Sequence, residues 1–392
     1  MTYGLTHIIG TALARPVTLL PLWSSWPKPL QSLYTYILGA HLAHTLDFAT
    51  ALCFYHLVWL PALPAAAQGL AGSWVLPIFA FNLAAMLLLV GGWHANMYAS
   101  QTADTAQGPL ASYKFNPVNQ YGPAAAQDGH LRREVVLQTL GWLQAAALQC
   151  AFLHLYATRA VGGLAHEPFF AGPSSPSGWP TLATLAQPAT LWNVGCVLAV
   201  TYWREVHFYF CHRGMHPWTQ EGAQTAGRSG PWWDAGGFLY RVAHSWHHKS
   251  TNPGPWSGMA MSPIEHFLYF SCAWLLPLAA LANPALAVHP MAFLYCLFHA
   301  CIAPIAGHDG FAAPGGGSDY HYLHHAMFEC NYGVPWPIDF DSLCGSWVAW
   351  EWVEKTKTAD GRVSLSRAKK YGRLLRELGS SEAAVAAAMK VE

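Results

Sequence analysis

Residues 73–94 read SWVLPIFAFNLAAMLLLVGGWH and contain no Lys, Arg, Asp or Glu. Crossing a hydrocarbon core of about 30 Å takes about 20 mostly apolar residues in a helix, so this stretch predicts a transmembrane span. Five further candidates lie at about 33–60, 135–157, 188–203, 264–282 and 285–303. Only Asn283-Pro284 separates the last two, which predicts a helical hairpin. The sequence therefore predicts an all-α integral membrane protein, a helical bundle with about four to six spans.

The overall composition supports a membrane protein. Of the 392 residues, 53% are hydrophobic and only 10% are charged, whereas soluble domains carry roughly 25% charged residues. Lys plus Arg (20) equals Asp plus Glu (20), which argues against a nucleic-acid partner, because such proteins use excess positive charge to neutralise phosphates. The nine cysteines include no C-x2-C pair, so neither a disulfide framework nor a zinc ribbon is predicted.

The basic residues indicate the orientation of the spans. Loops that stay in the cytosol carry most of the Lys and Arg residues of a membrane protein. With the spans drawn as above, every Lys and Arg except Arg159 lies on one side. Both termini and residues 204–263 are therefore expected in the cytosol. The competing interpretation is that some of these stretches are buried helices of a soluble protein, in which case the sorting of charge is a coincidence.

Histidines are concentrated in three short clusters: HRGMH at 212–216, HSWHH at 244–248 and HYLHH at 321–325. Spacings of three and four residues place side chains on one face of a helix, about 5–6 Å apart, which a metal ion can bridge. His308 lies thirteen residues before the third cluster, in HDG. The predicted metal ligands are His212, His216, His244, His247, His248, His308, His321, His324 and His325.

So many histidines favour two metal ions, since nine imidazoles exceed the coordination positions of one. Neutral imidazole suits iron, zinc, copper or nickel, and iron is the choice that makes an oxidation catalyst. The topology lets the clusters meet. No span separates the first from the second, and a hairpin of two spans separates the second from the third, so all lie on one side of the membrane. We expect a cytosolic histidine-rich di-metal domain that caps the bundle.

Other residues near the clusters have secondary roles in this interpretation. Glu205, Glu265 and Asp309 are available to orient the ligand rings, although each could instead be a helix cap or form a surface salt bridge. His207 and His299 are second-rank ligand candidates. His299 lies nine residues before His308, two and a half helical turns, and so faces roughly away from it.

The three clusters read H-x3-H, H-x2-HH and H-x2-HH, and smaller features accompany them. These are Glu205 seven residues before His212, Tyr240-Arg241, the Pro-Ile-Glu element at 263–265, and Asn331-Tyr332-Gly333. Over roughly 190–352 the chain resembles the fatty acid hydroxylase and sterol desaturase superfamily of membrane di-iron enzymes. HRGMH, HDG and the residues that follow HYLHH are most similar to the sterol C-5 desaturase branch.

The resemblance implies three regions: a membrane-spanning region at 1–189, a catalytic domain at 190–352 and a basic cytosolic tail at 353–392. It also implies two iron ions, O2 as co-substrate, and electrons from NAD(P)H through cytochrome b5 or a similar donor. The substrate is expected to be a lipid taken from the bilayer, and the location the endoplasmic reticulum. Desaturation and hydroxylation both remain open.

Three alternatives to a sterol desaturase remain. The lipid could be a fatty acyl or carotenoid-like molecule that is hydroxylated. The protein could be a metal-binding membrane transporter without redox activity. It could also be a catalytically inactive scaffold, although every ligand position of the three clusters is filled.

Overall fold

The computed structural model describes residues 42–98, 103–105, 114–124, 128–170, 181–311, 317–334, 338–357, 364–378 and 382–389. These residues form helices and contain no β-strand, only isolated bridges. The helices before the second histidine cluster are α3 (Leu42–Phe54), η3 (Tyr55–Trp59), α4 (Leu60–Ala66), α5 (Gly72–Met86), η4 (Leu87–Gly91), α6 (Gly92–Tyr98), α8 (His130–Ala157), α9 (Leu182–Leu185), α10 (Pro188–Gly214), α11 (Gln220–Gln224) and α12 (Ala235–Val242). Those from the second cluster onward are η6 (His244–Lys249), η7 (Pro255–Ser257), α13 (Pro263–Phe270), η8 (Ser271–Trp274), α14 (Leu275–Ala282), η9 (Pro284–Leu286), α15 (Met291–Gly307), α16 (Gly317–Met327), α17 (Phe340–Cys344), α18 (Trp350–Thr356), α19 (Leu365–Glu377) and α20 (Glu382–Met389).

Four helical segments are long and apolar enough to cross a membrane: Leu46–Ala66, Gly72–Ala95, His130–Ala157 and Pro263–Ala282. They correspond to four of the six predicted stretches, and the prediction of an all-helical membrane bundle is confirmed. Residues 33–41 of the first predicted span lie outside the described part of the chain.

The other two predicted spans are α10 and α15, which are not among these four segments. α10 begins at Pro188, where proline suits the first turn because that turn needs no N–H donor. It then continues past residue 203 to Gly214, so one helix carries the membrane region directly into the first histidine cluster. α15 has 17 residues, of which Met291–Ile302, Pro304 and Ile305 are buried.

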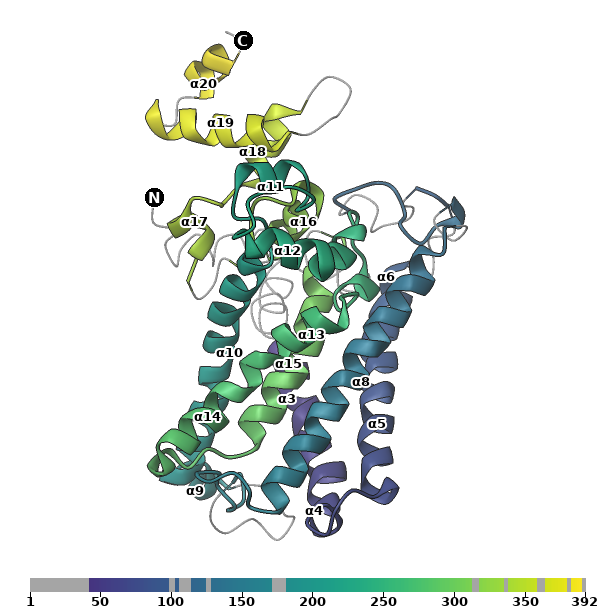
Figure 1. Ribbon diagram of the computed structural model, residues 1–392, viewed down its shortest axis with the longest axis vertical. Helices are drawn as coiled ribbons and strands as arrows, with labels where there is room; N and C mark the ends of the chain where they lie inside the picture. Colours follow the sequence, from purple (N-terminus) through teal and green to yellow (C-terminus); the bar gives the residue numbers. More distant parts are fainter. Residues whose placement is uncertain are drawn as a thin grey trace.

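α15 lies at the centre of the bundle, beside α3, α8 and α10 (Figure 1). Its aromatic residues interlock with those of neighbouring helices. Phe298 packs edge-to-face on Phe54, with ring centroids 5.3 Å apart, and Phe293 stacks on Phe152 at 3.9 Å. This packing fixes the position of α15, and His308 follows directly after its last residue.

Above the bundle, the short helices α11, α12, α16, α17 and α18 form the histidine-rich cap (Figure 1). The C-terminal helices continue from it and share a second hydrophobic core with the cap. In that core Ala368, Tyr371 and Val385 are buried with Met327 and Trp352. A Cβ on Gly372 would lie 2.2 Å from the Trp352 ring, so this close approach requires glycine. The core crosses the predicted boundary at residue 352, and the division into three regions stays a prediction.

Candidate metal centre

The first histidine cluster lies at the cap end of α10. His212 is in the last turn of this helix and His216 lies just beyond it, so the two rings are close, with centroids 5.3 Å apart. The second cluster adopts a 3-10 helix, η6, rather than the predicted α-helix. The third cluster lies on α16, and His308 follows directly after the last residue of α15. All nine rings are buried, with at most 5% of each residue exposed.

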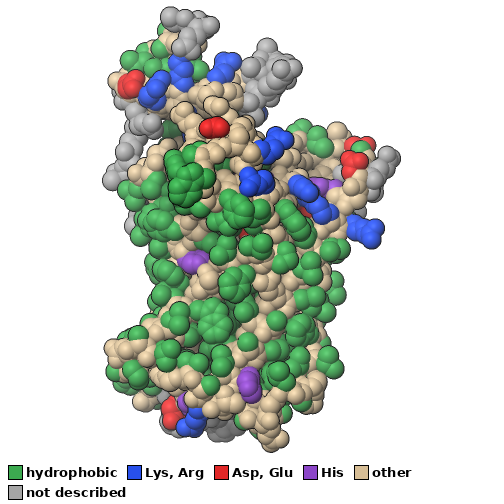
Figure 2. Space-filling view, viewed as in Figure 1, with side chains coloured by type: hydrophobic (Ala, Val, Ile, Leu, Met, Phe, Trp, Pro, Cys, Tyr) green, Lys and Arg blue, Asp and Glu red, His purple; other side chains and the backbone are tan. Residues whose placement is uncertain are grey.

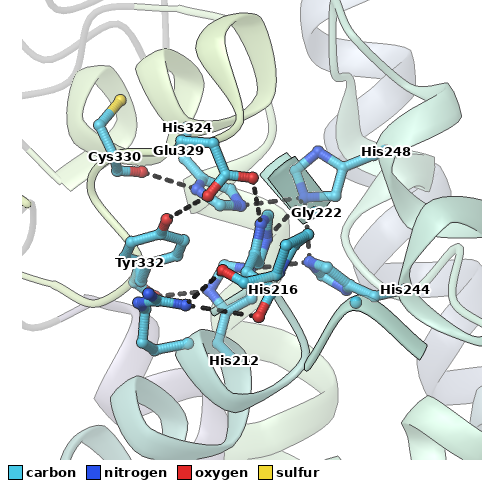
Figure 3. A network of polar contacts seen from close by, with 12 residues as sticks. His212, His216, Gly222, His244, His248, His324, Glu329, Cys330 and Tyr332 are labelled. Atoms are coloured by element: carbon cyan, nitrogen blue, oxygen red, sulfur yellow. Dashed lines mark hydrogen bonds and ion pairs between the residues drawn. The ribbon is translucent and has the colours of Figure 1, made fainter. Parts of the chain in front are cut away.

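The nine histidines divide into two groups that the spacing alone does not reveal. His212, His216, His244, His248 and His324 form the first group, shown in Figure 3. His247, His308, His321 and His325 form the second group. Within each group the candidate ligand atoms all lie within 4.8 Å of one another. The second and third clusters each contribute to both groups.

Within each group the Nε2 atoms converge. The Nε2 atom of His248 lies 2.9 Å from that of His244 and 3.0 Å from that of His324. In the second group, the Nε2 atom of His308 lies 2.9 Å from that of His321 and 3.0 Å from that of His325. Metal–imidazole bonds of about 2.1 Å set at right angles place neighbouring nitrogens about 3.0 Å apart. The spacing of these nitrogens therefore fits a metal ion in each group.

The other ring nitrogen, Nδ1, has an acceptor in several of these histidines. The Nδ1 atoms of His212, His308 and His324 donate to the backbone carbonyls of Tyr332 (2.5 Å), Pro304 (2.7 Å) and Cys330 (2.7 Å), respectively. A carbonyl oxygen only accepts, so these rings carry their hydrogen on Nδ1, and Nε2 presents a lone pair to the group. Lone pairs that face one another at about 3 Å repel unless a cation lies between them.

Two carboxylates also contact first-group rings. Oε1 of Glu265 lies 2.6 Å from Nδ1 of His244. Oε1 of Glu329 lies 3.4 Å from Nδ1 of His216, and its other oxygen accepts from the Tyr332 hydroxyl. Glu265 was anticipated from sequence in this position, but Glu329 was not. Its place four residues after His325 is the only sequence signal that could have singled it out.

A turn after the third cluster holds the carbonyl that His212 contacts. Asn331 adopts a left-handed backbone conformation (φ 51°), which asparagine tolerates better than most residues. The carboxylate of Asp341 accepts from the backbone N–H groups of Tyr332 (2.9 Å) and Gly333 (2.7 Å). These bonds fix the direction of the Tyr332 carbonyl and, through it, the His212 ring.

The remaining sequence candidates lie elsewhere. Glu205 pairs with Arg204 rather than with a ring of either group, and Asp309 accepts from the indole of Trp93 and the backbone N–H of Phe311. Burial raises the pKa of Asp309 to about 7. Both second-rank histidines lie outside the two groups. His207 contacts the hydroxyl of Ser271, and His299 contacts Asp47.

Burial keeps the rings of both groups uncharged at neutral pH. It lowers the pKa of His244 to about 3 and that of His308 to about 4. Burial and the neighbouring histidines lower the pKa of His247, His248 and His325 well below the ordinary value. Since a metal binds the unprotonated imidazole, these rings are in the ligating form.

A cavity opens between the two groups. His212 and His244 of the first group and His247, His308 and His321 of the second line it. Its other walls are mostly apolar, including Phe208, Met215, Met261 and Val334. A hydrocarbon chain or ring system in this cavity would lie against histidines of both groups.

Comparison with known proteins agrees with this geometry. Residues 197–346 match the family model described as "Fatty acid hydroxylase". Over 108 residues the chain is 28% identical to a Delta(7)-sterol 5(6)-desaturase of Gibberella zeae. That alignment covers 24% of this chain and 30% of the relative, so it spans under a third of that protein's length. No solved structure matches.

Proposed function

We propose that this membrane protein is a di-iron, O2-dependent lipid oxidoreductase, because residues 197–346 match the fatty acid hydroxylase family model. It introduces a double bond or a hydroxyl group into a sterol or a related lipid. Fatty acyl and carotenoid-like lipids are the alternative substrates. Similarity to a Delta(7)-sterol 5(6)-desaturase supports the sterol over these alternatives.

One observation carries the proposal: two adjacent groups of buried, uncharged imidazoles point their Nε2 atoms inward around one cavity. We assign all nine histidines as ligands of two iron ions. The first group supplies five nitrogens and the second four, so octahedral ions would retain open positions for exogenous ligands. A donor set made entirely of imidazole suits iron and disfavours magnesium or calcium.

Two bound iron ions would supply the redox chemistry that activates O2 toward an unactivated C–H bond. The protein's own part is to hold the ligand rings and the lipid. Nδ1 contacts with backbone carbonyls and with Glu265 fix the ring directions, so that the Nε2 lone pairs face inward. The apolar walls of the cavity exclude water and hold the hydrocarbon beside both histidine groups.

Both outcomes use one O2 and two external electrons. Hydroxylation leaves one oxygen atom in the lipid and one in water, whereas desaturation leaves both in water. We propose that cytochrome b5 or a similar cytosolic donor supplies the electrons, which originate from NAD(P)H.

The proposed location is the endoplasmic reticulum, with the cap and both termini in the cytosol. Figure 2 shows Lys and Arg side chains gathered at the cap end of the molecule, with few at the opposite end. Cytosolic segments of membrane proteins carry such an excess of positive charge, which supports this orientation.

Lipid profiling of cells with and without the gene, grown under 18O2, tests the function. We expect a product lipid that requires both iron and the gene. An alcohol product would contain 18O and an alkene product would not. Unchanged lipids in cells that contain iron-loaded protein would contradict the proposal.

A further inference from the structure

A chain of polar and charged side chains links four helices inside the bundle, below the histidine cavity. Asp47 of α3 contacts His299 of α15, with Oδ2 and Nδ1 2.5 Å apart. Nε2 of His299 lies 3.7 Å from Oε1 of Glu205 on α10, and the same oxygen lies 2.5 Å from Nη1 of Arg204. Arg204 also donates from Nη2 to the hydroxyl of Tyr269 on α13. Ionisable groups buried within a membrane bundle are costly and commonly mark a functional site.

Arg204 and Tyr269 connect this network to the cavity, because both line it. The guanidinium of Arg204 lies 5.2 Å from the centroid of the Phe208 ring, which in turn stacks 5.0 Å from the His212 ring. Arg204, Phe208 and His212 are spaced four residues apart and share one face of α10. Along the axis of α10, Arg204 lies about 12 Å, or two helical turns, from His212.

The polar end of the cavity has hydrogen-bonding capacity that the described residues do not use. Nε of Arg204 is buried and has no hydrogen-bond partner among them. The hydroxyl oxygen of Tyr269 accepts from Arg204, so its own hydrogen remains available to donate. A buried donor without an acceptor costs free energy, and a ligand oxygen would remove that cost.

The charges in the network favour an uncharged ligand. Glu205 already balances the positive charge of Arg204, and Asp47 adds a further carboxylate beside His299. A carboxylate or phosphate bound here would meet two carboxylates and no unmatched positive charge. An uncharged oxygen would receive the hydrogen bonds without that repulsion.

We propose that Arg204 and Tyr269 form a subsite that holds the hydroxyl oxygen of an uncharged lipid alcohol. The carbon skeleton then lies along Phe208, with the C–H bond to be oxidised beside His212 and His321, which also line the cavity. This inference rests on the proposed function, for which it names a class of substrate. It assigns binding and positioning, rather than chemistry, to Arg204 and Tyr269.

Photocrosslinking to the full chain in phosphatidylcholine nanodiscs tests the subsite. Three probes each carry a diazirine and an alkyne. They are a sterol alcohol, an octadecanol and an octadecanoate. The two alcohols each have a matched analogue in which hydrogen replaces the hydroxyl group. We expect at least one alcohol to be captured about tenfold more than its deoxy analogue and more than the carboxylate.

Two variants reduce this preference if the subsite is correct. Tyr269→Phe removes one hydroxyl donor and keeps the ring, so we expect the ratio of alcohol to deoxy capture to fall about fivefold. Arg204→Lys keeps the positive charge but removes Nε and the planar arrangement of N–H donors. It should therefore also lower the ratio of alcohol to deoxy capture. Tyr156→Phe is the matched control. It removes a hydroxyl that donates to the carbonyl of Ala165 at 3.0 Å and does not line the cavity, so the ratio should not change.

The sterol and octadecanol arms identify which alcohol binds. Equal capture of both alcohols and their deoxy analogues, or preferred capture of the carboxylate, overturns the subsite. Capture ratios unchanged by both variants also overturn it. The measurement needs no turnover. A protein that discriminates between the probes but never oxidises lipid would contradict the proposed function and leave the subsite standing.

Discussion

Two regions of this molecule bury many polar side chains, and they do so in opposite ways. In the cap, uncharged imidazoles point their Nε2 atoms toward one another at about 3 Å, in two groups that contain no carboxylate. In the bundle, contacts between opposite or complementary groups join four side chains, those of Asp47, His299, Glu205 and Arg204. Convergence without a complementary partner indicates a place for a bound cation. Mutual pairing indicates a network whose members stabilise one another, while Nε of Arg204 remains available to a ligand.

The two regions should therefore respond differently to substitution. The cap should lose its metal and its chemistry while the fold persists. The bundle network should lose stability while the metal groups persist.

The largest effect is expected from removing one ligand of either group. His324→Ala in the first group or His247→Ala in the second should lower lipid oxidation by about 1000-fold or more, because even outer-sphere partners contribute about 10–100-fold to metal sites. Product formed per protein and bound iron are the measurements. His56→Gln, which changes an exposed histidine of the bundle, should retain activity. Retained turnover in either alanine variant would remove that residue from the ligand set.

Acid should destabilise the metal-free protein by several kcal/mol. Burial holds the pKa of His244 at about 3 and that of His308 at about 4, whereas unfolded histidine titrates near 6.5. Between these values the unfolded state binds more protons, so stability is full above about pH 6.5 and is lost as the pH falls. Unfolding of metal-free protein at pH 7.5 and 5 measures this loss.

A matched variant separates the histidine groups from other acid-sensitive sites. The double substitution His244→Gln and His308→Gln lacks two of the titrating rings and should lose less stability over the same interval. Equal stability of the unsubstituted metal-free protein at both pH values would contradict buried, uncharged imidazoles.

Asp47→Asn should destabilise the bundle by about 3–5 kcal/mol, the usual effect of breaking a buried ion pair from one side. Iron content per folded protein should be unchanged, because no ligand of either group contacts Asp47. Denaturant unfolding and iron analysis measure the two quantities. Asp128→Asn, at an exposed position, should shift stability by less than about 0.5 kcal/mol. Loss of iron without loss of stability would reverse the roles assigned to the two regions.

Glu265→Gln should have the smallest effect. Glu265 is buried, which disfavours its ionised form in the metal-free protein, but a cation bound to the adjacent His244 would favour the ionised carboxylate. The amide oxygen of Gln can still accept from Nδ1 of His244 but cannot supply that negative charge. We expect iron affinity to fall about 10–100-fold, measured by competition with a chelator. Glu351→Gln, an exposed carboxylate of α18, should leave affinity unchanged. Unaltered affinity in Glu265→Gln would show that charge at this position does not tune the ligand.

The sequence predicted the helical bundle and the nine histidines because both leave periodic signals. Apolar runs such as 73–94 and spacings such as HRGMH depend on residue type and position alone. The division of His247 from its neighbours His244 and His248 has no such signal, because it depends on how η6 packs between α10 and α16. Two of the six predicted spans, α10 and α15, also differ from simple crossings, since one continues into the cap and the other is buried by neighbouring helices.

The groups that orient the rings were mostly unpredictable. Three of the five acceptors are backbone carbonyls, of Pro304, Cys330 and Tyr332, and any residue type can supply a carbonyl. Proximity in sequence suggested Glu205 and Asp309, but in the fold Glu205 faces Arg204 and Asp309 faces Trp93. Of the three carboxylates suggested from sequence, only Glu265 contacts a ring of either group.

The short helix η6 contributes neighbouring residues to different metal groups: His248 to the first and His247 to the second. An ion that immobilises one of these rings also restrains the backbone of the other. Filling of the two groups is therefore expected to be cooperative, so that a half-supplied preparation contains mainly doubly loaded and empty molecules. Under iron limitation, cells would then contain a small number of protein molecules that hold two ions, rather than many that hold one.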